Sequence, residues 1–165
     1  MFVETHGVVP LPLTTARAAL DRALADGGLV EESRRAYAEG VAFLMRVGPR
    51  GAHGPAKQVL VQVLPSREVG STVVVPLRWQ ATGSTGRLFP ALDANLGLTE
   101  AGETATLLSI VGRYAPPLGR LGPVLDRAVM ARAANGTAEA LVREVVAKLR
   151  RLGGPGDPLP DRDRR

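Results

Sequence analysis

A chain of 165 residues corresponds to about one domain, and it is long enough to bury a core without disulfides or metal ions. Hydrophobic residues make up 45% of the chain and charged residues 22%, which is ordinary globular composition and excludes a disordered or fibrous chain. There is no cysteine, which excludes a disulfide framework, a thiolate nucleophile and a cysteine-ligated zinc site.

The formal charge of +5 does not indicate a nucleic-acid partner. Nearly all the cations are arginines scattered among alanine, glycine and proline, and Lys57 and Lys148 are the two lysines. Aromatic residues make up 4% of the chain, which is too few for a platform on which single-stranded bases could stack. We therefore expect no binding to nucleic acid.

The N-terminus lacks the pattern of a secretory signal, because Met1–His6 contains no basic segment followed by an apolar core. The apolar runs of the chain are also shorter than the roughly 20 residues of a membrane-spanning helix. The best candidate, Val41–Val47, is short and contains Arg46. We expect a cytoplasmic protein without integral membrane association.

The first predicted element is a strand over Phe2–Val9, which ends before Pro10 because proline cannot donate a hydrogen bond to a sheet. A short helix follows the strand. Thr14 or Thr15 can cap this helix, and its apolar residues recur every three to four positions. Gly27-Gly28 ends it.

A second short helix begins near Glu31 and Glu32, whose carboxylates suit the positive end of a helix dipole, and it reaches about Gly40. From Val41 onward, extended apolar runs are separated by clusters of glycine, proline and serine, a pattern typical of antiparallel strands joined by turns. Pro65–Gly70 is one of the predicted turns. The predicted strands are Val41–Val47, Lys57–Leu64, Ser71–Thr82, Arg87–Leu98 and Thr104–Ala115.

Alternating side chains assign the inner face of these strands, since successive residues of a strand point to opposite sides of the sheet. The last strand is apolar on both faces, and we take Leu108, Ile110 and Tyr114 as its inward residues. Arg78 and Arg113 then face solvent. The other inward residues are Val59, Val61, Val63, Val73, Val75, Leu77, Trp79, Ala81, Leu88, Leu92, Ala94, Leu96 and Leu98.

The final predicted element is one long helix, which begins near Pro123 and continues to about Leu152. Glu139 and Arg143 stand four residues apart on its polar side, where they can form an ion pair. The tail 153–165 is rich in proline and mixed charges and is predicted to be disordered, which leaves 1–152 as the domain. The apolar stripe of the helix consists of Leu121, Leu125, Ala128, Val129, Leu141, Val145, Leu149 and Leu152.

Two stretches of the last third are distinctive. Leu88–Leu96 reads LFPALDANL, and Thr106–Tyr114 reads TLLSIVGRY and is followed by Pro116-Pro117-Leu118-Gly119. With the order of the elements, they resemble the helix-grip fold of the START-like (SRPBCC, polyketide cyclase/dehydrase-like) superfamily. The resemblance implies an α+β fold, in which a curved antiparallel sheet of about six strands wraps around the long C-terminal helix. It also implies a hydrophobic cavity between sheet and helix, which different members use to carry lipids, sterols or polyketides, or to cyclise polyketides.

Nine residues are candidates for the lining of such a cavity. Tyr37, Trp79 and Tyr114 are the most informative, because an aromatic ring with a polar tip can hold an apolar ligand. The simpler interpretation is that these rings only fill the core. The full set is Tyr37, Val75, Leu77, Trp79, Leu92, Ile110, Tyr114, Leu125 and Val129.

Motifs for catalysis or metal binding are scarce. His6 and His53 are the two histidines; a metal site that includes them and Glu4 is conceivable, but isolated surface histidines are far commoner and we expect no metal. The loop Gly48–Gly54 is glycine-rich and basic, yet it lacks the Gly-Lys-Ser/Thr ending of a phosphate-binding loop. No Gly-x-Ser-x-Gly elbow supports hydrolase chemistry, and we assign neither catalytic residues nor a cofactor.

Three hypotheses for function remain open. The first is a binding or carrier domain for an apolar small molecule or lipid, because the inward residues lack an acid and a base. The second is a cyclase or dehydratase acting on a hydrophobic substrate, in which Tyr37 or Tyr114 polarises a carbonyl. The third is an interaction domain with a filled core, whose doubly apolar last strand would support a homodimer.

Overall fold

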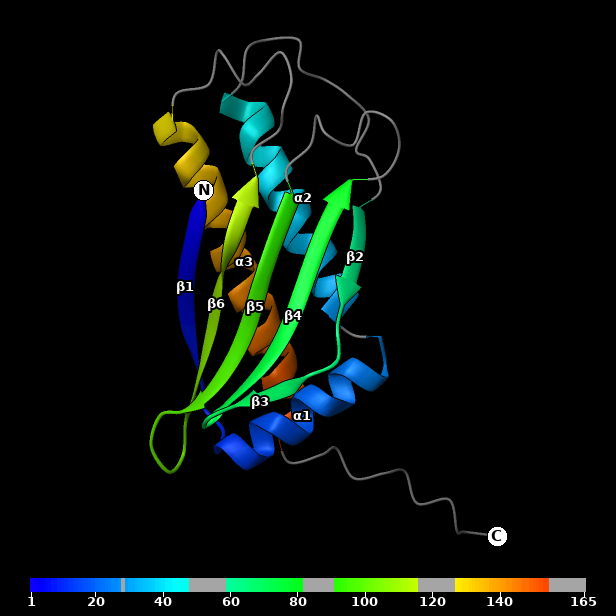
Figure 1. Ribbon diagram of the computed structural model, residues 1–165, viewed down its shortest axis with the longest axis vertical. Helices are drawn as coiled ribbons and strands as arrows, with labels where there is room; N and C mark the ends of the chain where they lie inside the picture. The colour runs from blue at the N-terminus through cyan, green and yellow to red at the C-terminus, as the bar shows by residue number, and fades with distance from the viewer. Residues whose placement is uncertain (28, 48–58, 82–90, 116–126, 155–165) are drawn as a thin grey trace, which may run out of the picture.

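The computed structural model describes residues 1–27, 29–47, 59–81, 91–115 and 127–154. Within these ranges, six strands form one antiparallel sheet and three helices pack on one of its faces (Figure 1). The predicted α+β class is therefore confirmed. The elements are β1 (Phe2–Val9), α1 (Leu13–Ala25), α2 (Leu29–Val47), β2 (Val59–Val63), β3 (Arg67–Val69), β4 (Thr72–Ala81), β5 (Ala91–Glu100), β6 (Thr106–Ala115) and α3 (Arg127–Gly153).

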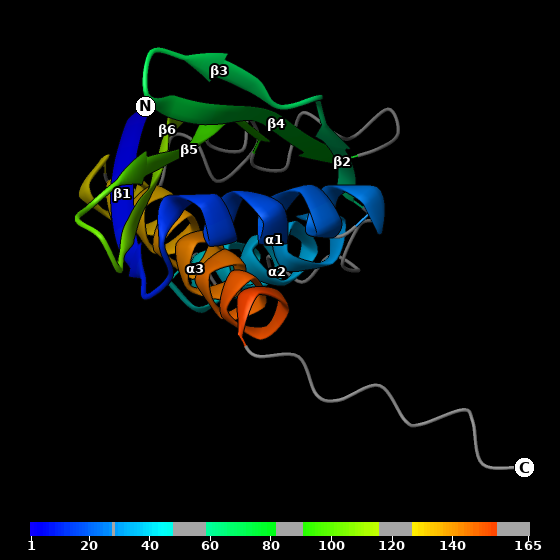
Figure 2. The ribbon, with the colours of Figure 1, turned by 90° about the horizontal axis from the view of Figure 1, so that it is seen from below.

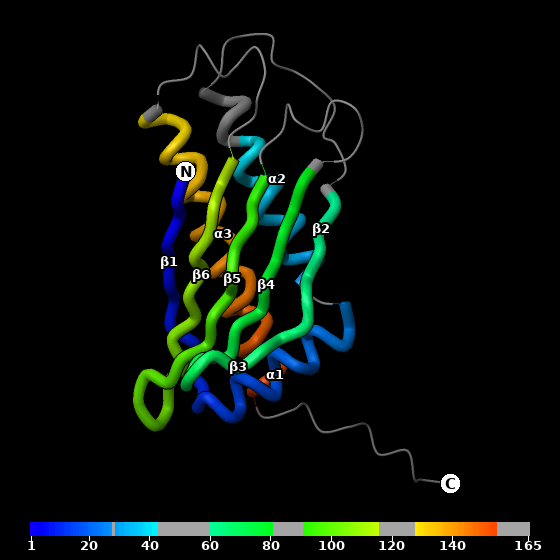
Figure 3. Tube along the Cα trace, in the orientation of Figure 1, coloured from blue at the N-terminus to red at the C-terminus, as the bar shows by residue number. Residues whose placement is uncertain are grey.

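The sheet places β1 beside β6, although the two strands lie far apart in the sequence. Its strands follow the order β1-β6-β5-β4-β2, and β3 pairs with β4 off this path. The amine of Met1 extends the pairing of β1 with β6 by donating a hydrogen bond to the carbonyl oxygen of Tyr114 at 2.7 Å. The Cα trace shows that the strands bend together, as the predicted curved sheet requires (Figure 3).

Two long helices, α2 and α3, lie along the concave face of the sheet, and α1 crosses them at one end (Figure 2). Helix α3 packs mainly on β1, while α2 lies against β2. Leu141, Val145 and Leu149 of α3 are fully buried and belong to the same core as Leu77 and Trp79 of β4. The predicted placement of the C-terminal helix against the inner face is confirmed for these residues.

The predicted strand Val41–Val47 is wrong, because these residues form the second half of α2. Their β-branched and aromatic side chains favour a strand, but the run also continues the helical spacing of Ser33 and Tyr37. Gly40, taken as a helix end, lies inside the helix, where a Cβ would overlap the hydroxyl of Thr137 on α3. This glycine is a contact between two helices rather than a stop signal, and α2 has 19 residues instead of being short.

The sheet still has six strands, because the short strand β3 takes the place of the predicted strand Val41–Val47 in the count. The predicted turn Pro65–Gly70 contains β3, whose residues pair with β4. Gly70, with a φ of +60°, and Ser71 form the two-residue turn between the two strands. All three residues of β3 are exposed, so the strand lacks the alternation by which a half-buried strand is recognised.

The predicted inner faces agree with the structure wherever side chains are described. Val61 and Val63 of β2 are half-buried against the core, and Arg78 and Arg113 are exposed. The side chains of Val59, Ala81, Leu88, Leu121 and Leu125 lie outside the described residues, as does the tail from residue 155. The buried inward residues are Val73, Val75, Leu77, Trp79, Leu92, Ala94, Leu96, Leu98, Leu108, Ile110 and Tyr114.

Two predicted local interactions are wrong. Helix α1 begins ahead of Thr14 and Thr15, and its N-cap makes no side-chain hydrogen bond. Arg143 pairs with Glu39 of α2, at 3.0 Å, rather than with Glu139. The neighbouring helix therefore supplies the partner that helical spacing alone assigned to α3.

The close approach of β5 and β6 has a local cause at Gly112. A Cβ built on this residue would overlap the carbonyl oxygen of Asp93 and the Cα of Ala94 on β5. These are backbone atoms, which a change of side-chain rotamer cannot move. Glycine therefore lets the two strands approach closely at this pair of residues, as glycines within strands often do.

Gly112→Ala should destabilise the fold by about 2 kcal/mol, since overpacking costs roughly 1–3 kcal/mol. Gly136→Ala is the control, because a Cβ there meets no atom within 4 Å and alanine favours a helix over glycine by about 1 kcal/mol. The free energy of unfolding in urea, followed through Trp79 fluorescence, should fall for the first variant and rise for the second. Wild-type stability of Gly112→Ala would show that the strands separate without cost.

Candidate functional site

Three polar aromatic residues from distant parts of the chain meet beneath the sheet. Trp79 of β4 lies opposite Leu92 of β5, which lies opposite Tyr114 of β6, so the three form one row across the inner face. Tyr37 of α2 approaches this row from the helix side, and its ring makes an edge contact with that of Trp79 at a centroid distance of 6.1 Å. All four side chains are buried. We call Tyr37, Trp79 and Tyr114 the aromatic cluster.

The polar atoms of the aromatic cluster are buried without hydrogen-bond partners. Among the residues that the structure describes, this holds for the hydroxyls of Tyr37 and Tyr114 and for the indole N–H of Trp79. Ser33, one helical turn before Tyr37, is a fourth case. Leaving such a group unpaired costs about 1–3 kcal/mol, and native proteins contain few of them. The cluster contains both tyrosines and the single tryptophan of the chain, so these unpaired atoms are concentrated in one place.

Burial sets the protonation state of the two phenols. Desolvation raises the pKa of Tyr37 from its ordinary value of 10.0 to about 12. Burial raises the pKa of Tyr114 further, an effect that the nearby Thr137 hydroxyl reduces and the Tyr37 phenol reinforces. Both phenols are therefore neutral at physiological pH, so each has a hydroxyl hydrogen that it can donate and neither is a phenolate base.

Two small polar residues of the helices accompany the cluster, and the sequence analysis named neither. Thr137 of α3 lies next to Tyr114 and donates its hydroxyl hydrogen bond to the carbonyl oxygen of Ala133 at 2.7 Å. Ser33 belongs to α2. Each is a buried polar residue on the otherwise apolar inner side of its helix. A polar residue within an apolar stripe is the sequence signal that could have identified them.

Of the nine predicted lining residues, seven are buried, one is half-buried and one lies outside the described residues. Val129 of α3 is half-buried, and Leu125 lies outside the described residues. Val75 and Ile110 share a cross-strand row with Leu96, away from the row of Trp79, so they border the cluster less directly. The buried members, which all belong to one core, are Tyr37, Val75, Leu77, Trp79, Leu92, Ile110 and Tyr114.

Glu32 is the one buried carboxylate in the described ranges, and it already has partners. It pairs with Arg35 of α2 at 3.0 Å and with Lys148 of α3 at 3.5 Å. Arg35 also reaches Glu144 of α3 at 2.7 Å. These ion pairs tie α2 to α3, and they occupy the buried acid that could otherwise serve as a base.

The predictions about metal binding, membrane association and the last strand concern parts of the structure outside the aromatic cluster. In the described part of the chain there is no group of three or more potential metal ligands. Glu4 and His6 are exposed on β1, and His53 lies in the segment 48–58 outside the described residues. None of the helices that the structure describes is long and apolar enough to cross a bilayer. Strand β6 lies between β1 and β5, so both of its edges are paired within the sheet.

Comparison with known proteins finds similarity in structure but not in sequence. The sequence matches no protein-family model, and no curated protein is significantly similar to it. A hypothetical protein from Helicobacter pylori superposes with a TM-score of 0.49 at 9% identity, over 89% of this chain and 86% of that one. The ZhuI aromatase/cyclase from Streptomyces sp. R1128 superposes with a TM-score of 0.39 at 14% identity, over 92% of this chain and 94% of that one.

The two tyrosines should titrate late in the folded protein. In a rapid pH jump, phenolate absorbance at 295 nm should stay absent below about pH 11, whereas in guanidinium chloride both phenols should ionise near pH 10. Because the unfolded chain releases these protons first, the free energy of unfolding should decrease as the pH rises above about 10. Half-ionisation of the folded protein at pH 10 would show that the phenols are not buried.

Proposed function

We propose that the protein binds an apolar small molecule between the sheet and the helices, with an oxygen atom of the ligand at the aromatic cluster. The observation that carries this proposal is the set of buried, unpaired donors on Tyr37, Trp79 and Tyr114. A ligand oxygen would supply the missing acceptor, and the surrounding leucines and valines would bury the rest of the molecule. A core that required bulk alone would be more stable with phenylalanine or leucine at these positions.

The donors narrow the chemistry of the ligand. An indole N–H can only donate, and a phenol whose pKa is raised to about 12 stays protonated. A neutral acceptor such as a ketone, an ester or a hydroxyl group fits this set. A carboxylate fits less well, because it would bring a charge into a site where none of the described residues is a buried cation. The proposed ligand is therefore a neutral, oxygen-bearing apolar compound.

A cyclase or dehydratase activity is the second candidate, and the two buried tyrosines are the observation that favours it. A protonated phenol can donate a hydrogen bond to a substrate carbonyl and stabilise the negative charge that develops on its oxygen. Such a reaction also needs a base, and the buried carboxylate of Glu32 is paired with Arg35 and Lys148. Binding is the better-supported function, and turnover of a bound carbonyl compound would decide for the enzyme.

The purified protein should contain such a ligand or accept one. Organic extraction and mass spectrometry should recover a neutral compound with a carbonyl or hydroxyl group. After extraction, 2-acetylnaphthalene should change the fluorescence of Trp79, the single tryptophan. 2-Ethylnaphthalene has the same size without the oxygen and should bind about 5–10-fold more weakly. A protein that is empty on extraction and responds to neither compound would contradict the proposal.

Tyr37→Phe and Tyr114→Phe should each weaken ligand binding without lowering the stability of the fold. Loss of an unpaired hydroxyl should leave the free energy of unfolding unchanged or raise it by about 1 kcal/mol. The affinity for 2-acetylnaphthalene, measured by Trp79 fluorescence, should fall about fivefold for each hydroxyl removed. 2-Ethylnaphthalene is the control ligand, and its affinity should not change. If both variants instead lose stability, the hydroxyls already have partners and the proposal fails.

A further inference from the structure

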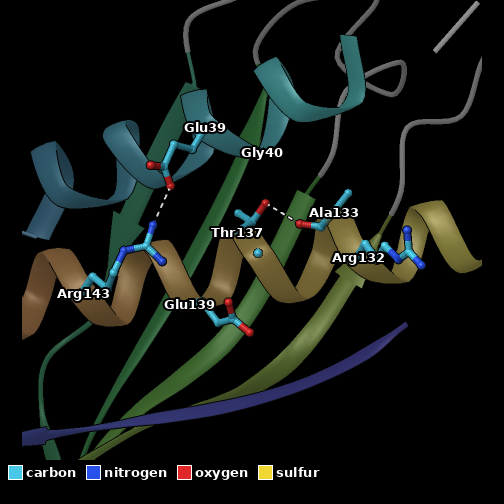
Figure 4. Close-up of a pocket in the computed structure, with 8 residues that line it drawn as sticks. Glu39, Gly40, Arg132, Ala133, Thr137, Glu139 and Arg143 are labelled. Atoms are coloured by element: carbon cyan, nitrogen blue, oxygen red, sulfur yellow. Dashed lines mark hydrogen bonds and ion pairs between the residues drawn. The ribbon is translucent and has the colours of Figure 1, made fainter. Parts of the chain in front are cut away.

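A hollow of about 400 Å³ opens between α2 and α3 on the side of the helices that faces away from the sheet (Figure 4). Its rim carries exposed charged side chains, and its floor consists of small buried residues. Gly136 completes the lining as an exposed position of α3. The rim residues are Glu39, Arg132, Glu139 and Arg143, and the floor residues are Gly40, Ala133 and Thr137.

Thr137 lies between this hollow and the aromatic cluster. It lines the hollow, and its hydroxyl lies beside that of Tyr114 on the inner side. Across from it on α2, a Cβ on Gly40 would lie 3.2 Å from the Cβ of Thr137. The hydroxyl of Tyr114, a residue only 1% exposed, therefore lies next to Thr137 at its contact with Gly40.

Helix α3 is weak at this contact. Asn135, Gly136 and Thr137 are consecutive poor helix formers in its interior, and glycine is the poorest after proline. Packing does not require the glycine, since a Cβ there would meet no atom within 4 Å. Further along the helix, Leu141 and Leu149 are fully buried in the core. A helix that is weak at one turn and anchored beyond it can separate locally from its neighbour.

We infer that the hollow between α2 and α3 is the passage by which the ligand reaches the aromatic cluster, and that the contact between Gly40 and Thr137 opens to admit it. This inference rests on the proposed function. The residues at the contact are small, so a modest separation of the helices creates an opening. The hydroxyl of Tyr114 then offers the entering oxygen its first hydrogen bond.

A reversible disulfide across the contact tests the inference, and the native chain contains no cysteine that could interfere. Gly40→Cys/Thr137→Cys joins positions whose Cβ atoms lie 3.2 Å apart, slightly closer than the roughly 3.5–4.5 Å usual for a disulfide. Oxidation should slow both the association and the dissociation of 2-acetylnaphthalene at least tenfold, measured by stopped-flow Trp79 fluorescence. Dithiothreitol should restore both rates.

Gly7→Cys/Val142→Cys is the matched control, a disulfide on the other side of α3 that would join this helix to β1. A Cβ on Gly7 of β1 would lie 2.6 Å from Cγ1 of Val142, and both residues line a second hollow of about 360 Å³. Oxidation of this pair should change the rates less than twofold. The passage would be overturned, and the proposed function left intact, by either of two results. In the first, only the disulfide between positions 7 and 142 slows the exchange of 2-acetylnaphthalene; in the second, wild type binds this ligand and neither disulfide slows its exchange. A wild-type protein that binds nothing would overturn the proposed function itself.

Gly136→Ala provides a second test that does not depend on the folding of the double variant. It borders the hollow, adds no steric conflict and strengthens α3 at its weak turn. It should slow the exchange of 2-acetylnaphthalene about two- to fivefold, because the opening of the contact would have to overcome a more stable helix. Wild-type exchange rates in this variant would overturn the inference.

Discussion

The packing of α3 into the concave face of the sheet is the constraint on which the rest of the structure depends. Leu141, Val145 and Leu149 are fully buried there, and each such side chain contributes roughly 1.5–3 kcal/mol when it leaves water. The strands bend together over the two helices, and Gly112 permits the close approach of β5 and β6 within this sheet. Alternation along β4 and β6 turns the row of Trp79 and Tyr114 toward the helices.

Against this apolar background, the unpaired polar atoms of the aromatic cluster oppose folding. Three such groups together cost several kcal/mol, in a domain whose total stability is expected to be about 5–15 kcal/mol. Tyr37 and Tyr114 could each be replaced by phenylalanine with almost no change of shape, which would remove that cost. Places where a sequence accepts such a cost are typically functional sites, because the unfavourable arrangement in the free protein becomes favourable in the complex.

Much of the fold could be predicted from local patterns, and the errors occur where local patterns conflict or are absent. Alternation identified β4 and β5 and their inner faces, including that of Trp79. β6 is apolar on both faces, so alternation did not decide its inner face, but the choice of Leu108, Ile110 and Tyr114 is confirmed. β3 escaped because its residues are all exposed, and Val41–Val47 was misassigned because strand propensity competes there with helical spacing. At the site, the sequence placed the tyrosines and the tryptophan inside. It could not show that Trp79 and Tyr114 share a row, since that depends on the register of two strand pairs. Nor could it show that their polar atoms lack partners, because a missing hydrogen bond is a property of the packed interior.

The misassigned half of α2 and the inferred passage have a common physical cause. Read alone, Gly40 is a helix terminator; beside α3, it is the position where Thr137 needs the space that a Cβ would occupy. Because α2 continues past this glycine, the two helices run together far enough to cover the aromatic cluster. The contact that covers it is nevertheless made by a residue without a side chain. No neighbouring atom requires a glycine at position 136, since a Cβ there would meet nothing within 4 Å. The effect of Gly136 is therefore only to weaken α3 next to Thr137. One glycine thus lets the helices meet and another limits how firmly they are held, which is the combination that a closed but accessible interior requires.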